Sequence, residues 1–306
     1  MFYEAAHNAE EFDIGNIGSW DTSKNKRVRA MFEDAGYSAK VWNIGKLSYV
    51  DDNHQGWTIN SSVSDFAYMF DGAGYSAEDV FDVGDLGEWN MSSATDMSYM
   101  FHNAGHSATV WSVGNLGYVD VDHPGWNVSK AKDMSHLFDG AGYSATSWSI
   151  GDISSWTVAA ATSMAYMFNE AGYSAEQSFD LGNLDNWNVS LVTSTSYMFH
   201  NAGHSAATTW NIGDLSGWTT IKVTNMSYMF NGAGYSAPTW DIGDLDGWDV
   251  SVASSVNYMF YNAGYSATTW NIGDISAWTT KAGVNHTNFI NANLHNTNTI
   301  VEPIWN

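Results

Sequence analysis

Apolar and polar positions alternate in short runs along this chain, and the runs recur every 30 to 38 residues. One run, Val223 to Phe230, reads V-T-N-M-S-Y-M-F, and another, Trp240 to Leu245, reads W-D-I-G-D-L. Alternation with a period of two predicts short β-strands that face a core. Between the two kinds of run a glycine recurs, at 36, 74, 105, 142, 172, 203, 234 and 264, and it predicts a tight corner with positive φ.

Aromatic residues keep the same period in three columns, and we expect these columns to point into the core. The first column is Trp20, Trp57, Trp89, Trp126, Trp156, Trp187, Trp218, Trp248 and Trp278. The second is Phe12, Trp42, Phe81, Trp111, Trp148, Phe179, Trp210, Trp240 and Trp270. The third is Phe2, Phe32, Phe70, Phe101, Phe138, Phe168, Phe199, Phe230 and Phe260.

A fixed period of this length is typical of solenoids, propellers and arrays. Helical spacing is not sustained over ten residues anywhere in the sequence, so helix should be minor. The pattern predicts a mainly β repeat solenoid, leucine-rich-repeat-like or β-helix-like, with about nine coils of roughly 30 residues over residues 1–278. Residues 279–306, where the pattern decays, are expected to cap it. A β-propeller is the alternative, although a blade needs about 40 residues.

Composition narrows the class of function. The net charge of −23 opposes binding to nucleic acid, and the absence of cysteine removes disulfides and thiolate metal sites. We expect no membrane insertion, because the sequence contains no run of about 18 apolar residues. A nucleophile elbow, a phosphate loop and a unique acid pair are all missing from the sequence, so we expect no enzyme.

The runs from Trp89 to Phe101 (W-N-M-S-S-A-T-D-M-S-Y-M-F) and from Trp187 to Phe199 resemble a known repeat. They are similar to the "surface protein" repeats of BspA-like bacterial proteins and of mycoplasma lipoproteins. That resemblance implies a leucine-rich-repeat-like fold, an extracellular or cell-surface location, and a role in adhesion rather than catalysis. The repeat of this chain is longer, because A-G-Y-S-A-x-x-W-x-I-G-D adds a second aromatic position.

Acidic residues recur in a D-x-G-D pattern, which gives two interpretations. Asp82, Asp85, Asp241 and Asp244 could line up carboxylates from adjacent coils, and oxygen clusters of that kind suit calcium. The alternative, which we favour, is that these side chains make turn-type hydrogen bonds to the backbone. We therefore expect no cofactor, with calcium as the alternative.

Two H-N-A-G-H segments place histidines four residues apart, at His102/His106 and His200/His204. This spacing resembles a zinc-binding helix. Equivalent positions elsewhere hold Tyr261 and Tyr265, however, and a glycine lies within each pair. Histidine is therefore interpreted as a variant of an aromatic column.

Two seven-residue insertions are the clearest departures from the repeat. They fall within residues 48–56 and 117–125, between the Leu and the Trp of the same corner and two coils apart. We expect them to project as neighbouring loops on one face, which in solenoids is often the binding face. Their candidate ligand-binding residues are Tyr49, Asp51, Asp52, His54, Tyr118, Asp120, Asp122 and His123. Decorative loops are the alternative.

Basic residues concentrate near the start of the chain. The first 46 residues hold six basic and seven acidic side chains, so the remaining 260 carry a net charge of −22. Lys24, Lys26, Arg27 and Arg29 are expected, with Phe2 of an uncapped first coil, to form an assembly end. A head-to-tail contact there would build filaments or end-to-end oligomers.

These patterns predict a non-catalytic structural repeat protein of the cell surface, acting in adhesion or surface assembly. Its expected partners are copies of itself, other surface proteins or glycans, and not nucleic acid. The alternative function is a ligand- or calcium-binding module that uses the two inserted loops.

Overall fold

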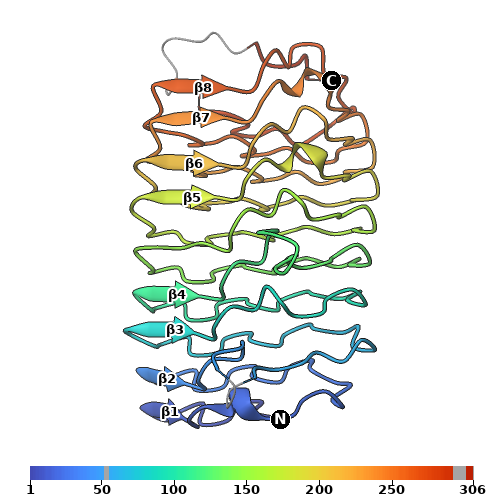
Figure 1. Cartoon of the computed structure of the whole chain (residues 1–306). Helices are drawn as coiled ribbons and strands as arrows, with labels where there is room; N and C mark the ends of the chain where they lie inside the picture. The colour runs from blue at the N-terminus through green and yellow to red at the C-terminus, as the bar shows by residue number, and fades with distance from the viewer. Residues whose placement is uncertain (52–54, 292–300, 306) are drawn as a thin grey trace.

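The computed structural model describes residues 1–51, 55–291 and 301–305. The chain winds as a β-solenoid of about nine coils stacked along one axis, with the N-terminus at one end and the C-terminus at the other (Figure 1). We number the coils by the third-column phenylalanine that opens each, from coil 1 at Phe2 and coil 2 at Phe32 to coil 9 at Phe260. The predicted mainly β solenoid is thus confirmed, in place of the propeller.

The strands are short and lie above one another along one side of the stack (Figure 1). Within the described residues they form four parallel pairs, and each pairs equivalent positions of two successive coils, as in Phe12 with Trp42. Each strand buries its central aromatic residue and exposes at least the first of its two flanking residues. The strands are β1 (Glu11–Asp13), β2 (Val41–Asn43), β3 (Val80–Asp82), β4 (Val110–Ser112), β5 (Ser178–Asp180), β6 (Thr209–Asn211), β7 (Thr239–Asp241) and β8 (Thr269–Asn271).

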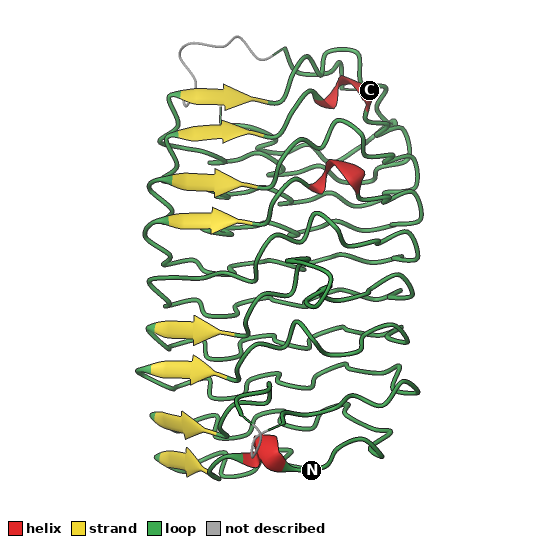
Figure 2. Cartoon of the chain, in the orientation of Figure 1, coloured by secondary structure: helices red, strands yellow, loops and turns green. Residues whose placement is uncertain are grey.

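Helix is confined, in the part of the chain that the structure describes, to three short 3-10 turns (Figure 2). They are η1 (Ile17–Ser19), η2 (Leu184–Asn186) and η3 (Leu245–Gly247). Each begins after an Asn or Asp whose side chain accepts a hydrogen bond from the backbone two residues on, as Asn183 does from Asp185. The remaining corners are turns and extended segments, which agrees with the expectation of little helix.

The aromatic columns form the core, with one exception at coil 1. Trp187, Trp240 and the other tryptophans of coils 2–9 in the first two columns are 0–6% exposed. Trp20 is 44% exposed and Phe2 is partly buried. The inward prediction was therefore wrong for Trp20, which is exposed although the other tryptophans of its column are buried.

The Met-Phe run is built differently from the predicted strand. Tyr228 has φ +58°, a left-handed conformation that breaks an extended strand, and the run consists of turns with isolated bridges such as Asn225 to Ser255. Its backbone still hydrogen-bonds to the next coil, with 2.9 Å from the Phe230 nitrogen to the Met259 oxygen. Coils are therefore joined by hydrogen bonds even where no strand forms.

The recurrent glycine makes the corner that its spacing predicts. Gly172 has φ +54°, and a Cβ placed on it would lie 2.7 Å from the Cβ of Trp148. The left-handed backbone disfavours a side chain here, and the close approach of the indole excludes one. The equivalent glycines at the other seven corners also have positive φ.

A stack of partly exposed rings follows the corner glycine in coils 2–9 and Ala6 in coil 1, and we call it the corner ladder. Neighbouring ring centroids are 4.5–5.0 Å apart. The ladder consists of His7, Tyr37, Tyr75, His106, Tyr143, Tyr173, His204, Tyr235 and Tyr265. His106 and His204 are thus members of an aromatic column, as their sequence positions indicate.

Candidate recognition groove beside the inserted loops

The two insertions leave the solenoid beneath them unchanged. In coil 3, which has no insertion, the Trp89 nitrogen donates to the Leu86 oxygen over 3.0 Å. In coil 4 the same bond joins Trp126 to Leu116 over 2.9 Å, although residues 117–125 now lie between them. The loops are therefore excursions from closed corners, and coil 3 lies between the two coils that carry them.

Loop 117–125 has a hydrogen-bonded interior. The Asp120 carboxylate accepts bonds from the backbone nitrogens of Asp122 and His123, each over 2.9 Å, and contacts His123 Nδ1 at 3.0 Å. The Val119 nitrogen donates to the His123 oxygen over 3.0 Å. This Asx turn fixes the conformation of the loop between Tyr118 and Pro124.

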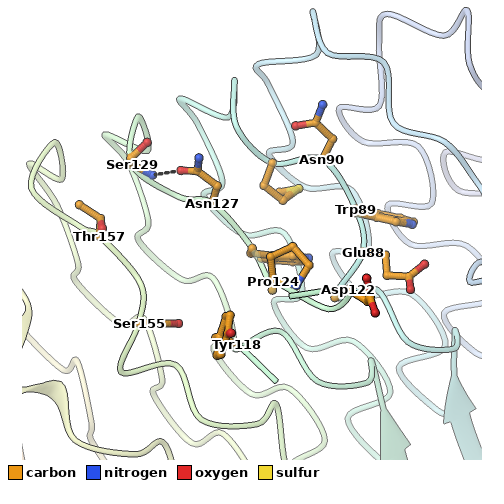
Figure 3. Close-up of a pocket in the computed structure, with 14 residues that line it drawn as sticks. Glu88, Trp89, Asn90, Tyr118, Asp122, Pro124, Asn127, Ser129, Ser155 and Thr157 are labelled. Carbon is orange, nitrogen blue, oxygen red and sulfur yellow. Dashed lines mark hydrogen bonds between the residues drawn. The ribbon is translucent and has the colours of Figure 1, made fainter. Parts of the chain in front are cut away.

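One side of this loop borders a groove of about 930 Å³ that crosses coils 3, 4 and 5 (Figure 3). The buried indoles of Trp89 and Trp126 lie along its base together with Met91. Its remaining lining residues are Gly87, Glu88, Asn90, Tyr118, Asp122, Pro124, Gly125, Asn127, Ser129, Ser155 and Thr157. The volume is at the upper end of the roughly 300–1,000 Å³ typical of small-molecule sites.

The groove presents neutral polar groups and one exposed aromatic ring. The Asn127 Oδ1 atom accepts the Ser129 backbone N–H over 3.1 Å, and Asn90 holds Ser92 in the same way. These bonds orient both amide side chains through their oxygens, and no bond from either amide nitrogen to a described residue is found, so these N–H groups can donate to a ligand. Tyr118 is 56% exposed.

The charges that border the groove are negative. Glu88 and Asp122 line it, and none of the lining residues, all of which the structure describes, is basic. Across the loop, His123 Nε2 lies 3.5 Å from the Glu88 carboxylate. The hydrogen bond to Asp120, followed by the charges of Asp120 and Glu88, raises the pKa of His123 above its ordinary value. When His123 is protonated, its contact with Glu88 is an ion pair that links the loop to coil 3.

The predicted loop residues do not converge on one groove. Tyr118 and Asp122 line the large groove, while Asp120 and His123 border a second groove of about 280 Å³ on the other side of the loop. Tyr49 borders a third, of about 230 Å³, which also contacts Glu88 and Trp89. Asp51 is exposed. Asp52 and His54 lie outside the described residues.

Glu88, Asn90, Asn127, Ser155 and Thr157 are groove residues that the sequence pattern did not single out. Asn90, Asn127, Ser155 and Thr157 occupy repeat positions at which other coils also carry Asn, Ser or Thr, whereas Glu88 is the one acidic residue directly before a first-column tryptophan. A second signal is the position of coil 3, which has no insertion and lies between two coils that have one.

The aspartates proposed as calcium ligands make turn hydrogen bonds. Asp82 Oδ1 accepts the Gly84 N–H over 2.8 Å, and its other oxygen pairs with Lys46. Asp85 accepts from Gly87, while Asp241 and Asp244 accept the N–H groups two residues further on. No group of three or more acidic or histidine side chains within the described ranges could hold a metal ion. The four aspartates therefore make the turn-type hydrogen bonds that we favoured from the sequence. Calcium binding remains an untested alternative.

The basic residues of the proposed assembly end are used in two ways. Arg29 pairs with Asp65 at 3.1 Å and with Asp96 at 3.6 Å, and its guanidinium lies 4.9 Å from the Tyr68 ring centroid. Arg29 is therefore committed to contacts within the chain. Lys24, Lys26 and Arg27 are exposed, and no ion pair is found for them with any residue that the structure describes.

Comparison with known proteins places the chain in a repeat family. No curated protein and no solved structure matches it. Within the described residues, no helix is long and apolar enough to cross a membrane. The family model described as "Mycoplasma protein of unknown function, DUF285" matches residues 1–119, 39–174, 114–212 and 173–302, which overlap along the repeat. The chain therefore belongs to this Mycoplasma-type repeat family.

Proposed function

We propose that this protein is a non-catalytic cell-surface or extracellular repeat scaffold that acts in adhesion, and that the groove beside loop 117–125 is its recognition face. The observation that carries the proposal is the position of that groove. The similar coils form a regular solenoid surface, and the groove of about 930 Å³ lies where loop 117–125 projects from that surface. A repeat scaffold concentrates its specific contacts where insertions project from it.

Chemistry at the groove supports binding rather than catalysis. Its two carboxylates, Glu88 and Asp122, stand beside neutral amides and hydroxyls, and no nucleophile paired with a base lines it among the described residues. The strongly acidic chain is also a poor partner for nucleic acid. Similarity to mycoplasma surface repeats supports the proposed location.

Loop replacement tests this function. Residues 117–125 are replaced by Gly-Glu, the sequence that joins Leu86 to Trp89 in coil 3. Because coil 3 closes the same corner with these two residues, we expect the variant to fold. Beads coated with the parent chain should adhere to layers of cultured animal cells or to glycan films, and beads coated with the variant should lose most of that adhesion. Equal adhesion of the two would overturn the proposed recognition face.

End-to-end association is a second candidate function, favoured by the surface of coil 1. Trp20 is 44% exposed there, and Lys24, Lys26 and Arg27 are exposed beside it in the sequence, whereas residues after the first 46 carry a net charge of −22. A locally basic surface and an acidic one favour head-to-tail contact. Light scattering should show oligomers that dissociate when the three basic residues are changed to Glu. A parent chain that remains monomeric at low and high salt would exclude this role.

A further inference from the structure

We propose that the large groove binds a neutral oligosaccharide, with Tyr118 as the stacking platform. This inference rests on the proposed recognition function and names its ligand class. It follows from three features of the groove: an aromatic ring whose faces are not covered by other rings, a lining without basic residues, and an array of oriented amides and hydroxyls.

The ring of Tyr118 differs from the tyrosines of the corner ladder. Tyr143, for example, is stacked between His106 and Tyr173, with centroids at 4.7 and 4.6 Å, so both of its faces are covered. Tyr118 has no ring partner among the described residues, and it is 56% exposed on a loop fixed by the Asp120 turn. An exposed, positioned aromatic face is suited to the apolar C–H face of a pyranose ring.

The charges of the groove exclude anionic ligands. Glu88 and Asp122 would repel a phosphate, a sulfated sugar or a sialylated one, and no described lining residue offers a compensating positive charge. The same carboxylates accept hydrogen bonds from sugar hydroxyls, and bonds to ionised acceptors are the stronger kind. A neutral polyol therefore fits the lining, whereas an acidic one does not.

The neutral polar groups distinguish a sugar from a cationic peptide. Asn90, Asn127, Ser129, Ser155 and Thr157 outnumber the two carboxylates. Sugar hydroxyls both donate and accept, as these amides and hydroxyls do. Glu88 already faces His123 at 3.5 Å, which reduces its availability to an ammonium group. A groove built to hold a lysine or arginine side chain would be expected to direct its carboxylates at the ligand alone.

The shape of the groove favours an oligosaccharide over a single sugar. It is open along coils 3, 4 and 5, and adjacent coils in a β-solenoid are about 4.8 Å apart. Asn90, Asn127 and Thr157 follow the equivalent tryptophans of coils 3, 4 and 5 and so form a row along the solenoid axis, with Tyr118 and Ser155 on the other side (Figure 3). A chain of sugars can therefore lie parallel to the solenoid axis, between this row and Tyr118.

Calorimetric titration of the full chain tests the proposal. The probes are neutral hexasaccharides of glucose, mannose and N-acetylglucosamine, with a sulfated hexasaccharide and hexalysine as rivals. We expect at least one neutral hexasaccharide to bind, and Tyr118→Ala to weaken that binding at least about tenfold, whereas Tyr118→Trp retains it. Tyr3→Ala is the matched control, because Tyr3 is 54% exposed and lies in coil 1, away from the groove. The sulfated probe should not bind.

Three outcomes would overturn the sugar assignment: no neutral hexasaccharide binds, Tyr118→Ala leaves binding unchanged, or hexalysine binds and Tyr118→Ala does not affect it. If these occur while loop replacement still abolishes adhesion, the recognition face stands and only its ligand class is wrong. If loop replacement has no effect on adhesion, the proposed function fails independently of any sugar result.

Discussion

Tyrosine has two contrasting uses in this molecule. In the corner ladder, rings such as Tyr173 are enclosed between neighbours at 4.6 and 4.5 Å and contribute to the cohesion of adjacent coils. On loop 117–125, Tyr118 projects 56% exposed and without a ring partner in the described part of the chain. Residues that recur in every coil are covered by their own copies in the next one. Residues that interrupt the repeat have no copy to cover them and remain available to a ligand.

The largest expected effect is a loss of stability when a buried tryptophan of the repeated region is removed. Trp187 is 1% exposed, stacks on Trp156 and Trp218 at 6.3 and 6.4 Å, and donates its indole N–H to Ile153. Trp187→Ala should cost about 3–5 kcal/mol of unfolding free energy, since it removes a large buried aromatic residue. The midpoint of urea unfolding measures this.

Trp20→Ala is the matched control in the same column, and because Trp20 is 44% exposed its loss should be much smaller. Equal midpoints for Trp187→Ala and the parent would show that the column does not hold the coils together.

A smaller effect is expected at the glycine corners. Gly172→Ala forces a Cβ into left-handed backbone, at a cost of about 1–2 kcal/mol, and against Trp148 at 2.7 Å. Gly15→Ala has the same backbone requirement at φ +68°, but no heavy atom lies within 4 Å of its Cβ position. Thermal unfolding of both variants therefore separates backbone strain from packing. If Gly15→Ala lowers the melting temperature as much as Gly172→Ala, the indole contact contributes nothing.

The sequence predicted the repeated region better than the interruption. Aromatic periodicity and the corner glycines were sufficient for the β-solenoid, because both follow from one coil lying on the next. Alternation alone was misleading at Tyr228, which has φ +58° and forms turns rather than a strand. The predicted burial of Trp20 was also wrong, because a column pattern gives the same expectation for every member and Trp20 is 44% exposed.

At the groove, insertion lengths located the loops and so Tyr118 and Asp122. Glu88 and Asn90 remained hidden, because they occupy repeat positions and become groove residues only through the loops on the neighbouring coils. Asn90 can be found only once the coils are placed side by side, since Asn127 and Asn188 occupy the same position in other coils. Glu88 did carry a signal in the sequence, because no other coil has an acidic residue at its position.

Replacing residues 117–125 by Gly-Glu should change stability by no more than about 1 kcal/mol, because the corner hydrogen bond of coil 4 is the one that coil 3 makes without an insertion. Circular dichroism and thermal unfolding check this. A loss as large as that of Trp187→Ala would mean that the loop is part of the core structure, and would contradict its assignment as an excursion.

The smallest effect concerns two histidines at the same repeat position, whose neighbours differ. Burial lowers the pKa of His200 to about 4, and its partner is the neutral Asn169 at 2.6 Å. Burial also opposes protonation of His102, but its hydrogen bond to Asp71 at 2.7 Å and the charges of Asp71 and Asp139 raise its pKa above the ordinary value. Two-dimensional NMR of the imidazoles, recorded from pH 3 upward, measures both pKa values directly.

Protonation of His200 should therefore destabilise the fold, and protonation of His102 should stabilise it. Between its ordinary pKa and about 4, His200 takes up a proton more readily in the unfolded chain, so acidification through this window destabilises the fold. His102 stabilises the fold at low pH, and that contribution is lost as the pH rises through its raised pKa. Exchanging the neighbours should exchange the behaviour: Asp71→Asn should lower the pKa of His102, and Asn169→Asp should raise that of His200. If neither substitution changes the pKa of its histidine, the residue on the neighbouring coil does not control protonation at a repeat position. The contrast between ladder tyrosines and Tyr118 would then depend only on their exposure.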